Sequence, residues 1–178
     1  MKKVLIVSSS LRTGSNSEAL AEAFARGARE AGNEAEVISL RGKVIGFCRG
    51  CLACQKQLQC VIRDDADEIC AKALCADVLV FATPIYYYEM SGQLKTLLDR
   101  LNPLFPSDYA FRDVYMLTSA AENEEHVPQQ AVRGMEGWIE CFEHARLAGT
   151  VFMGGVTAPG EGMEHPALQE AYHMGKRI

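Results

Sequence analysis

Short apolar runs alternate along the chain with longer stretches that carry apolar residues at helical spacing. The runs cover residues 4–7, 37–40, 78–81, 114–117 and 150–153, and we expect each to be a strand. Apolar positions recur every three or four residues over 17–31, 67–75, 93–101, 128–145 and 166–177. This spacing predicts amphipathic helices. Strands and helices therefore alternate five times, within a single domain that spans residues 1–178.

The alternation predicts an α/β fold, because right-handed crossovers place helices on both faces of a parallel sheet. We expect a flavodoxin-like, doubly wound sheet of five strands in the order 2-1-3-4-5. Ligands of such sheets bind outside the carboxyl ends of the strands, at the switch between the first and third. The loops of residues 8–17, 83–91 and 118–126 should therefore converge.

The loop after the first run is rich in hydroxyl groups and leads directly into a helix. Its candidate donors are Ser9, Ser10, Ser15, Asn16 and Ser17. Arg12 is its only full charge. Helix N-termini favour negative charge and a guanidinium pairs with phosphate oxygens, so we predict a phosphate site. The alternative is a capping box of Ser15 and Glu18 in a solvated loop.

The loop after the third run carries three tyrosines and a methionine. Pro84 is expected to end the strand and leave the following amides free. Apolar rings at this edge suit a flat ligand, and a phosphate beside a planar ring indicates FMN. The alternative is that the tyrosines pack a subunit interface. We expect Tyr86 and Tyr87 near the ring and Tyr88 toward another chain.

Three segments, residues 9–17, 83–86 and 91–100, together resemble the NAD(P)H-dependent FMN reductase family. The most similar subgroup is the iron-sulfur flavoproteins and their cluster-free relatives. The resemblance implies NAD(P)H as co-substrate and a homodimer or homotetramer. It also implies that the FMN phosphate is held by Ser10, Arg12, Ser15, Asn16 and Ser17. The isoalloxazine would contact Pro84, Ile85, Tyr86 and Tyr87. Ser119, in the third loop, and Ser9, where relatives usually have glycine, complete the expected cofactor-binding set.

A cysteine-rich excursion occupies residues 41–63. Cys48, Cys51, Cys54 and Cys60 follow the spacing C-x2-C-x2-C-x5-C. This compact run is typical of a [4Fe–4S] site, and zinc fits it less well. A zinc site, a thiol/disulfide pair and unliganded thiols remain alternatives, because many relatives keep similar cysteines without a cluster and no proline follows the fourth cysteine. Cys70, Cys75 and Cys141 are expected to be small core residues.

The composition excludes some classes of function. A net charge of −5 argues against nucleic-acid binding, and the apolar run behind the N-terminus is too short for a signal peptide or membrane span. We therefore expect a cytoplasmic protein. The excursion has five basic residues and no acidic one, which predicts a positive field that stabilises thiolates or attracts an anionic electron donor. A plain solvated basic loop is the alternative.

We therefore expect an FMN-dependent oxidoreductase that uses NAD(P)H to reduce a flavin, a quinone or a similar small acceptor. No catalytic residue is assigned, because the flavin carries the chemistry. One exposed flavin face would serve donor and acceptor in turn, which predicts ping-pong kinetics. An electron carrier between proteins, with a ferredoxin-like partner, is the alternative, and a thiol redox sensor is a third.

Overall fold

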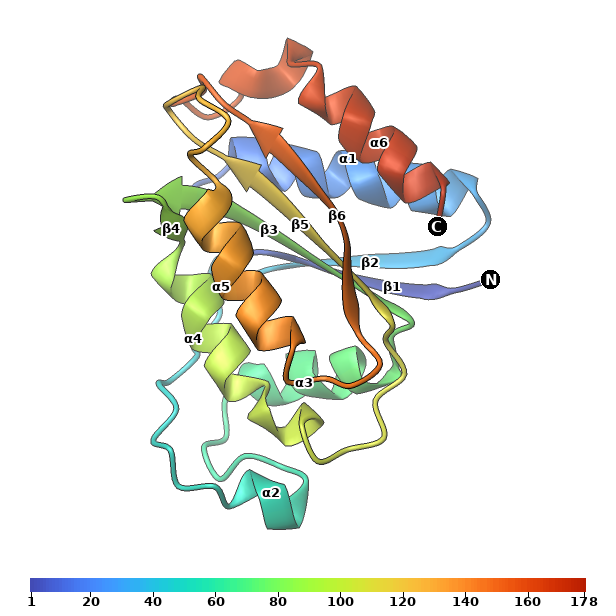
Figure 1. Cartoon of the computed structure of the whole chain (residues 1–178), viewed down its shortest axis with the longest axis vertical. Helices are drawn as coiled ribbons and strands as arrows, with labels where there is room; N and C mark the ends of the chain where they lie inside the picture. The colour runs from blue at the N-terminus through green and yellow to red at the C-terminus, as the bar shows by residue number, and fades with distance from the viewer.

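Five parallel strands form the centre of the molecule, whose computed structural model describes residues 1–178 (Figure 1). They are β1 (Lys3–Ser8), β2 (Glu34–Ser39), β3 (Val78–Tyr86), β5 (Asp113–Ser119) and β6 (Arg146–Met153). The order β2-β1-β3-β5-β6 confirms the doubly wound topology predicted from the sequence. A short strand, β4 (Glu89–Met90), pairs antiparallel with the end of β3 and was not predicted.

Helices cover both faces of the sheet, as expected. One face carries α1 (Asn16–Glu30) and α6 (Ala167–Lys176). The other carries α3 (Ala66–Cys75), α4 (Gly92–Arg100) and α5 (Gln129–Ile139). Three short helices, α2 (Cys54–Gln57), η1 (Asn102–Leu104) and η2 (Glu161–Glu164), lie in loops. None of these helices has the length and apolar character needed to cross a membrane.

The predicted helix over 128–145 was too long and the predicted strand over 150–153 too short. Helix α5 ends at Ile139, and tight turns then bring the buried Phe142 into the core. Strand β6 begins at Arg146, where it pairs with Asp113 of β5. The register between the two strands shifts between Val114 and Tyr115, an irregularity that apolar periodicity does not reveal.

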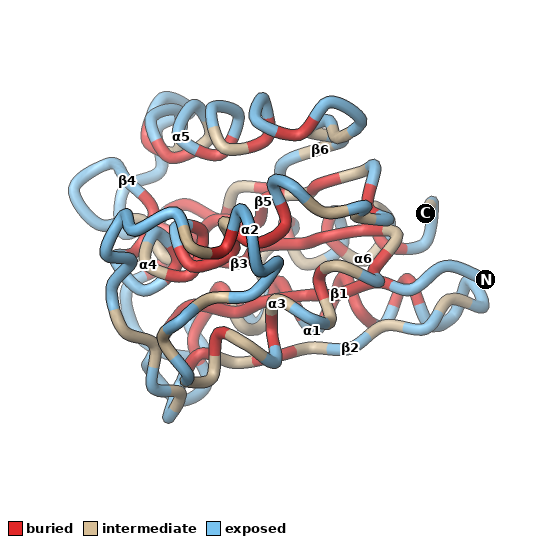
Figure 2. The backbone as a smooth tube through the Cα atoms, turned by 90° about the horizontal axis from the view of Figure 1, so that it is seen from below, coloured by how far each residue is buried: buried red, intermediate tan, exposed pale blue.

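The inner strands β1, β3 and β5 are largely buried because each face packs against helices, whereas the edge strands β2 and β6 are buried only in part (Figure 2). Leu5 and Val7 of β1 contribute to the core under α3, α4 and α5, whereas Val4 and Ile6 contribute to the core under α1 and α6. Strands covered on both faces read as continuous apolar runs, which is the pattern of the sequence.

Two glycines let α1 and α6 approach closely. A Cβ atom on Gly27 would lie 2.0 Å from the carbonyl oxygen of Tyr172, and one on Gly175 would lie 2.1 Å from that of Phe24. Any larger residue would push the helices apart. This contact holds α1 against α6, while the short connection from β1 places the N-terminus of α1 at the carboxyl edge.

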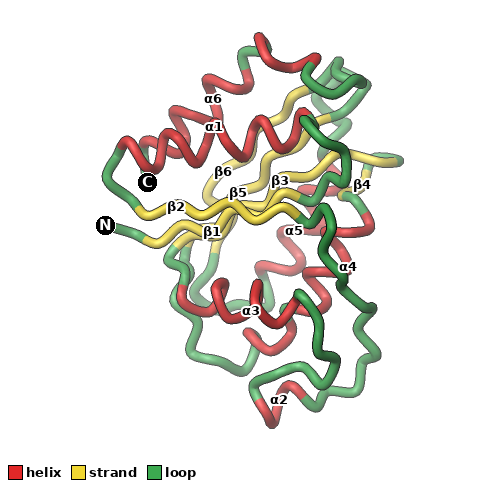
Figure 3. Tube along the Cα trace, turned by 180° about the vertical axis from the view of Figure 1, so that it is seen from behind, coloured by secondary structure: helices red, strands yellow, loops and turns green.

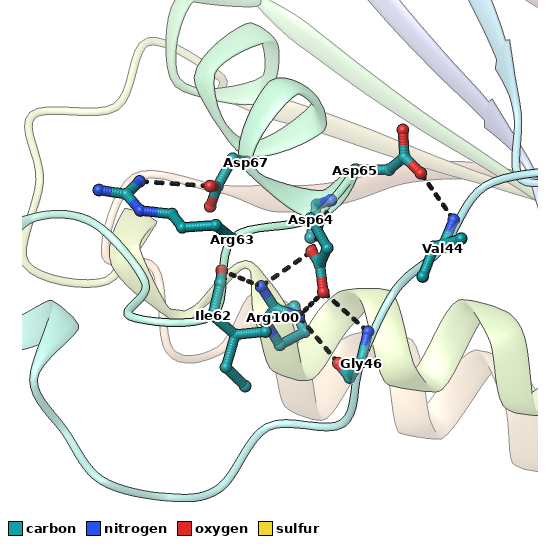
Figure 4. Close-up of polar contacts among 9 residues, drawn as sticks. Val44, Gly46, Ile62, Arg63, Asp64, Asp65, Asp67 and Arg100 are labelled. Atoms are coloured by element: carbon teal, nitrogen blue, oxygen red, sulfur yellow. Dashed lines mark hydrogen bonds and ion pairs between the residues drawn. The ribbon is translucent and has the colours of Figure 1, made fainter.

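The excursion leaves the sheet after β2 and returns before α3, with α2 at its far end (Figure 3). Both of its ends are held by Arg100, at the end of α4 (Figure 4). Arg100 Nη1 donates to Gly46 O (2.9 Å) and Asp64 Oδ2 (2.6 Å), and Nη2 donates to Ile62 O (2.9 Å) and Asp64 Oδ1 (3.0 Å). We call this arrangement the Arg100–Asp64 clasp.

The carboxylate of Asp64 accepts hydrogen bonds from two groups besides Arg100. These are the backbone N–H groups of Gly46 and Ala66. Burial favours the neutral acid, but the hydrogen bonds from Arg100, Gly46 and Ala66 outweigh it and hold the pKa of Asp64 below its ordinary value. The carboxylate is therefore charged in the folded protein at neutral pH, opposite a guanidinium that is 0% exposed.

Replacing Asp64 by asparagine should destabilise the protein by about 3–5 kcal/mol, because Arg100 would keep an uncompensated buried charge. The pKa of Asp64 is lower in the folded protein than in the unfolded chain. Its contribution to the free energy of unfolding is therefore fully present above the ordinary pKa of about 4, and it is lost as the pH falls through the folded-state pKa. Urea denaturation of both proteins at several pH values should show the difference shrinking in acid.

Asp99→Asn is the matched control for this variant. The carboxylate of Asp99 is 49% exposed and pairs with Lys95, so its loss should cost about 0.5 kcal/mol or less. Equal losses in the two variants would contradict the buried clasp.

Candidate functional site

A pocket of about 170 Å³ lies at the carboxyl ends of β1, β3 and β5, where the sheet topology predicts a ligand site. Its walls come from all three predicted loops and from a fourth segment after β6. The lining residues are Ser10, Arg12, Ser15, Asn16, Ser17, Pro84, Ile85, Tyr86, Ser119, Ala120, Ala121, Val156, Thr157 and Pro159. The structure thus brings together nine of the eleven residues that we predicted to bind a cofactor, and leaves out Ser9 and Tyr87.

Free backbone donors characterise the first loop. Of the amides from Ser10 to Ser17, only that of Arg12 donates to another protein group, the hydroxyl of Ser10 at 3.3 Å. The other N–H groups of this stretch have no acceptor in the protein and lie at the N-terminus of the fifteen-residue helix α1. Free amides at a helix N-terminus, beside buried hydroxyls and an exposed arginine, form a binding site for an anion such as phosphate.

The predicted helix cap forms, but only in part. The hydroxyl of Ser15 accepts from the N–H of Glu18 at 3.2 Å. The carboxylate of Glu18 pairs instead with Arg41 at 3.2 Å, which joins the start of the excursion to α1. Capping and an anion site therefore coexist here, because one cap occupies only one of the free donors.

Ser9 has a different position from the other predicted residues. Its hydroxyl lies 2.9 Å from that of Ser91, which caps α4, and Ser91 N donates to the hydroxyl of Thr83. This buried chain of hydroxyls joins β1, β3 and the start of α4. Ser9 therefore supports the pocket from behind, and its direct contact with a cofactor stays a prediction.

The tyrosine segment is a β-hairpin and not an open loop, so Pro84 does not end the strand as we expected. Pro84 continues the register of β3 opposite Ser119, and Tyr86 pairs with Glu89 across the turn. Proline fits because it lies near the end of the ladder, where a strand tolerates a missing N–H. Tyr87 and Tyr88 form the turn with φ of 51° and 66°, a left-handed conformation that disfavours tyrosine.

The three tyrosines have three different environments. Tyr86 lines the pocket, whereas Tyr87 is 100% exposed at the tip of the hairpin, so its predicted contact with the flavin stays untested. Tyr88 stacks on His126, with ring centroids 6.0 Å apart. A hydrogen bond to Glu122 and the negative charge of that carboxylate raise the pKa of Tyr88. Tyr88 therefore packs on the third loop of its own chain but is still 43% exposed, so its predicted position toward a second chain stays untested.

A segment after β6, residues 156–162, completes the pocket and was missed by the sequence analysis. We call it the strap. Arg12 Nη1 donates to the carbonyl oxygen of Thr157 at 2.7 Å. Asn16 Nδ2 donates to Ala158 O at 3.0 Å, while Asn16 Oδ1 accepts from the N–H of Gly162 at 3.0 Å. Asn16 therefore anchors the strap with both ends of its amide.

The strap is also held from within. The carboxylate of Glu161 accepts from the N–H groups of Thr157 and Ala158, and these bonds lower the pKa of Glu161. A Cβ atom on Gly162 would lie 2.3 Å from the sulfur of Met153, so glycine permits the close approach to β6. This segment also follows the carboxyl end of a parallel strand, as the three predicted loops do, so its position could have been predicted. Its glycines and proline indicate a loop.

The four cysteines of the excursion face one cavity of about 560 Å³ between the excursion, the end of α4 and the end of α5. Trp138, Phe142 and Cys141 line its opposite wall. Cys48 and Cys51 are exposed, Cys54 is buried and Cys60 is half-buried. No three His, Cys, Asp or Glu side chains lie close enough to hold a single metal ion.

Three of the five basic residues of the excursion pair with acids: Arg41 with Glu18, Lys43 with Asp65 and Arg63 with Asp67. Arg49, which lines the cysteine cavity, and Lys56 form no ion pair, so part of the expected positive charge remains. The prediction that all three other cysteines lie in the core was wrong. Cys75 and Cys141 are exposed and not core residues. Cys70 is partly buried, and burial raises the pKa of its thiol to about 12.

Comparison with known proteins gives consistent results. The sequence profile of the NADPH-dependent FMN reductase family matches residues 2–165. An iron-sulfur flavoprotein of Methanosarcina thermophila is 29% identical over 87% of this chain and 82% of its own. Iron-sulfur flavoprotein MJ1083 of Methanocaldococcus jannaschii is 39% identical over 57% of this chain, a match that spans about half (53%) of that protein.

Solved structures show the same fold. The NAD(P)H:quinone oxidoreductase from Methanothermobacter marburgensis superposes with a TM-score of 0.71 over 99% of this chain and 96% of that one, at 19% identity. Such low identity establishes the fold alone.

Tyr87→Asn should stabilise the protein by about 0.5–1 kcal/mol, because asparagine tolerates the left-handed turn that costs tyrosine roughly that amount. Tyr86→Asn is the control, since Tyr86 is extended and lines the pocket, and it should not stabilise. Urea denaturation measures both. If Tyr87→Asn destabilises the protein instead, the Tyr87 ring makes a stabilising contact outside this chain, for example with a second copy, that outweighs the strain of its backbone.

Proposed function

Because the chain belongs to the NADPH-dependent FMN reductase family, it is an NAD(P)H-dependent oxidoreductase, and we propose that it binds FMN in the pocket at the carboxyl edge of the sheet. The observation that carries this proposal is the row of unpaired amides and buried hydroxyls at the N-terminus of α1. A phosphate monoester is the group whose oxygens match such a donor set.

Each wall of the pocket has a distinct role in this proposal. Ser10, Ser15 and Ser17 and the free amides bind the phosphate, with the Arg12 guanidinium at the exposed side. Pro84, Ile85 and Tyr86 supply the apolar wall that orients the ring. The strap holds Arg12 and Asn16 in place through Thr157 and Ala158. FMN supplies the hydride and single-electron chemistry when it is bound.

The size of the pocket bears on the reaction. Its 170 Å³ is less than the roughly 300 Å³ at which ligand pockets usually begin, so it suits the phosphate end and leaves the ring at the open rim. Tyr86, at that rim, is 50% exposed. An open rim suits a nicotinamide and then an acceptor binding in turn, which supports ping-pong turnover. The name of the quinone oxidoreductase with the same fold supports a quinone as acceptor.

Arg12→Ala should lose most of its FMN affinity, because a charged hydrogen bond contributes about 1.5–3 kcal/mol, or roughly 10- to 150-fold in Kd. Arg133→Ala removes the same charge from an exposed site on α5 and is the matched control. Fluorescence titration with FMN measures affinity, and NADPH oxidation with a soluble quinone measures turnover. Equal FMN affinity in both variants would contradict the phosphate site, and no turnover by the flavin-loaded wild type would contradict the reductase.

Electron transfer between proteins, through FMN and a [4Fe–4S] cluster, is the second candidate. It is favoured by the four thiols that face one cavity and by the names of the iron-sulfur flavoproteins. The C-x2-C-x2-C-x5-C spacing suits a cluster better than a single zinc ion, and all four thiols face one cavity. Cys48, Cys51, Cys54 and Cys60 would hold it.

Anaerobically purified protein should then contain about four irons and four sulfides per chain. Cys51→Ser should lose most of the iron, whereas Cys141→Ser, which removes a thiol from the opposite wall of the cavity, should keep it. Metal analysis and absorbance spectra measure both. Flavin without iron in reconstituted wild type would exclude the cluster and leave the plain reductase.

A further inference from the structure

The Arg100 side chain has one hydrogen-bond donor without a partner. A guanidinium carries five N–H groups, and the clasp uses the four on Nη1 and Nη2. The fifth, on Nε, is buried and donates to nothing. A buried charged donor without an acceptor lowers the stability of the folded protein, so we searched its neighbours for a group that could accept its hydrogen bond.

Cys60 is the excursion residue that shares its surroundings with this donor. Arg100 and Cys60 both line the large cavity between the excursion and α5, and both line a second cavity of about 230 Å³. Pro103 also lines both cavities but has no polar side-chain atom. Cys60 is two residues from Ile62, whose carbonyl oxygen accepts from Arg100 Nη2. Burial opposes the charge of Arg100, but its hydrogen bonds to Asp64 outweigh burial and raise the pKa of Arg100. A thiol accepts hydrogen bonds weakly, whereas a thiolate or a metal-bound sulfur accepts them well.

We propose that Arg100 is a positioning residue for Cys60, its Nε–H being reserved for the sulfur of that cysteine. One side chain then performs two tasks. Its Nη groups close the excursion on Gly46, Ile62 and Asp64 (Figure 4). Its Nε–H places the fourth cysteine against the cavity that the other three face. The role in metal binding rests on the proposed cluster, but the placement of Cys60 beside the Nε–H of Arg100 does not.

The first test observes the contact directly, in iron-free, reduced, ¹⁵N-labelled protein. The Nε–H signal of Arg100, identified by its loss in Arg100→Lys, should exchange with solvent at least about tenfold more slowly than those of exposed arginines. Cys60→Ala should shift this signal, Cys60→Ser should partly restore its position, and Cys48→Ala should leave it unchanged. Fast exchange, or equal shifts in the Cys48 and Cys60 variants, would overturn the proposal.

The second test concerns the metal. After anaerobic reconstitution with iron and sulfide, Arg100→Lys should retain severalfold less iron than wild type at unchanged FMN content. Arg63→Lys, on the exposed side of the excursion, should match wild type. Asp64→Asn weakens the clasp but keeps Nε–H, so it should retain more iron than Arg100→Lys.

The outcomes separate the two proposals. Full iron content in Arg100→Lys, or equal losses in Arg100→Lys and Asp64→Asn, would overturn the positioning role. If wild type itself takes up no iron, the cluster proposal fails, and the Nε–H signal alone then upholds or overturns the contact with Cys60.

Discussion

The end of the parallel hydrogen-bond ladder is the constraint on which the site depends. Ser9 N donates to Ala82 O, and beyond that bond the backbone of the first loop has no strand to pair with. All parallel strands finish at the same edge, so the loops after β1, β3, β5 and β6 meet there. The N-terminus of α1, placed by the short connection from β1, adds its free amides to that edge. An anion site follows from the topology before any side chain is considered.

A second interaction, the Arg100–Asp64 clasp, allows the chain to carry an excursion with little regular structure. The excursion exposes Val44, Phe47 and Leu52 and has only the single turn of α2, so it contributes little apolar burial of its own. The clasp fixes both of its ends on α4, whose other end supports the hairpin through Ser91. The cysteine cavity and the proposed flavin pocket therefore lie at opposite ends of one helix, which couples their positions through a rigid element.

Much of the fold and most of the candidate site could be predicted from the sequence. The five apolar runs indicated the strands because both faces of the sheet are covered, and the strand order located three of the four loops. The predictions failed where distant residues decide the outcome. Tyr87 and Tyr88 form a hairpin turn against their local preference because β4 pairs with β3. Arg41, at the start of the excursion, pairs with Glu18 of α1, 23 positions away, and no local pattern indicates that ion pair.

The sequence by itself determined the layered α/β architecture, the helix that begins near Ser15 and the identity of the polar groups at the carboxyl edge. These depend on periodicity and local capping, which act over a few residues. Only the tertiary structure decided that Ser9 lies behind the pocket, that the strap closes over Arg12 and Asn16, and that Arg100 spans both ends of the excursion. Hydrogen bonds between residues far apart in the chain depend on how the elements pack, and no local pattern encodes that packing.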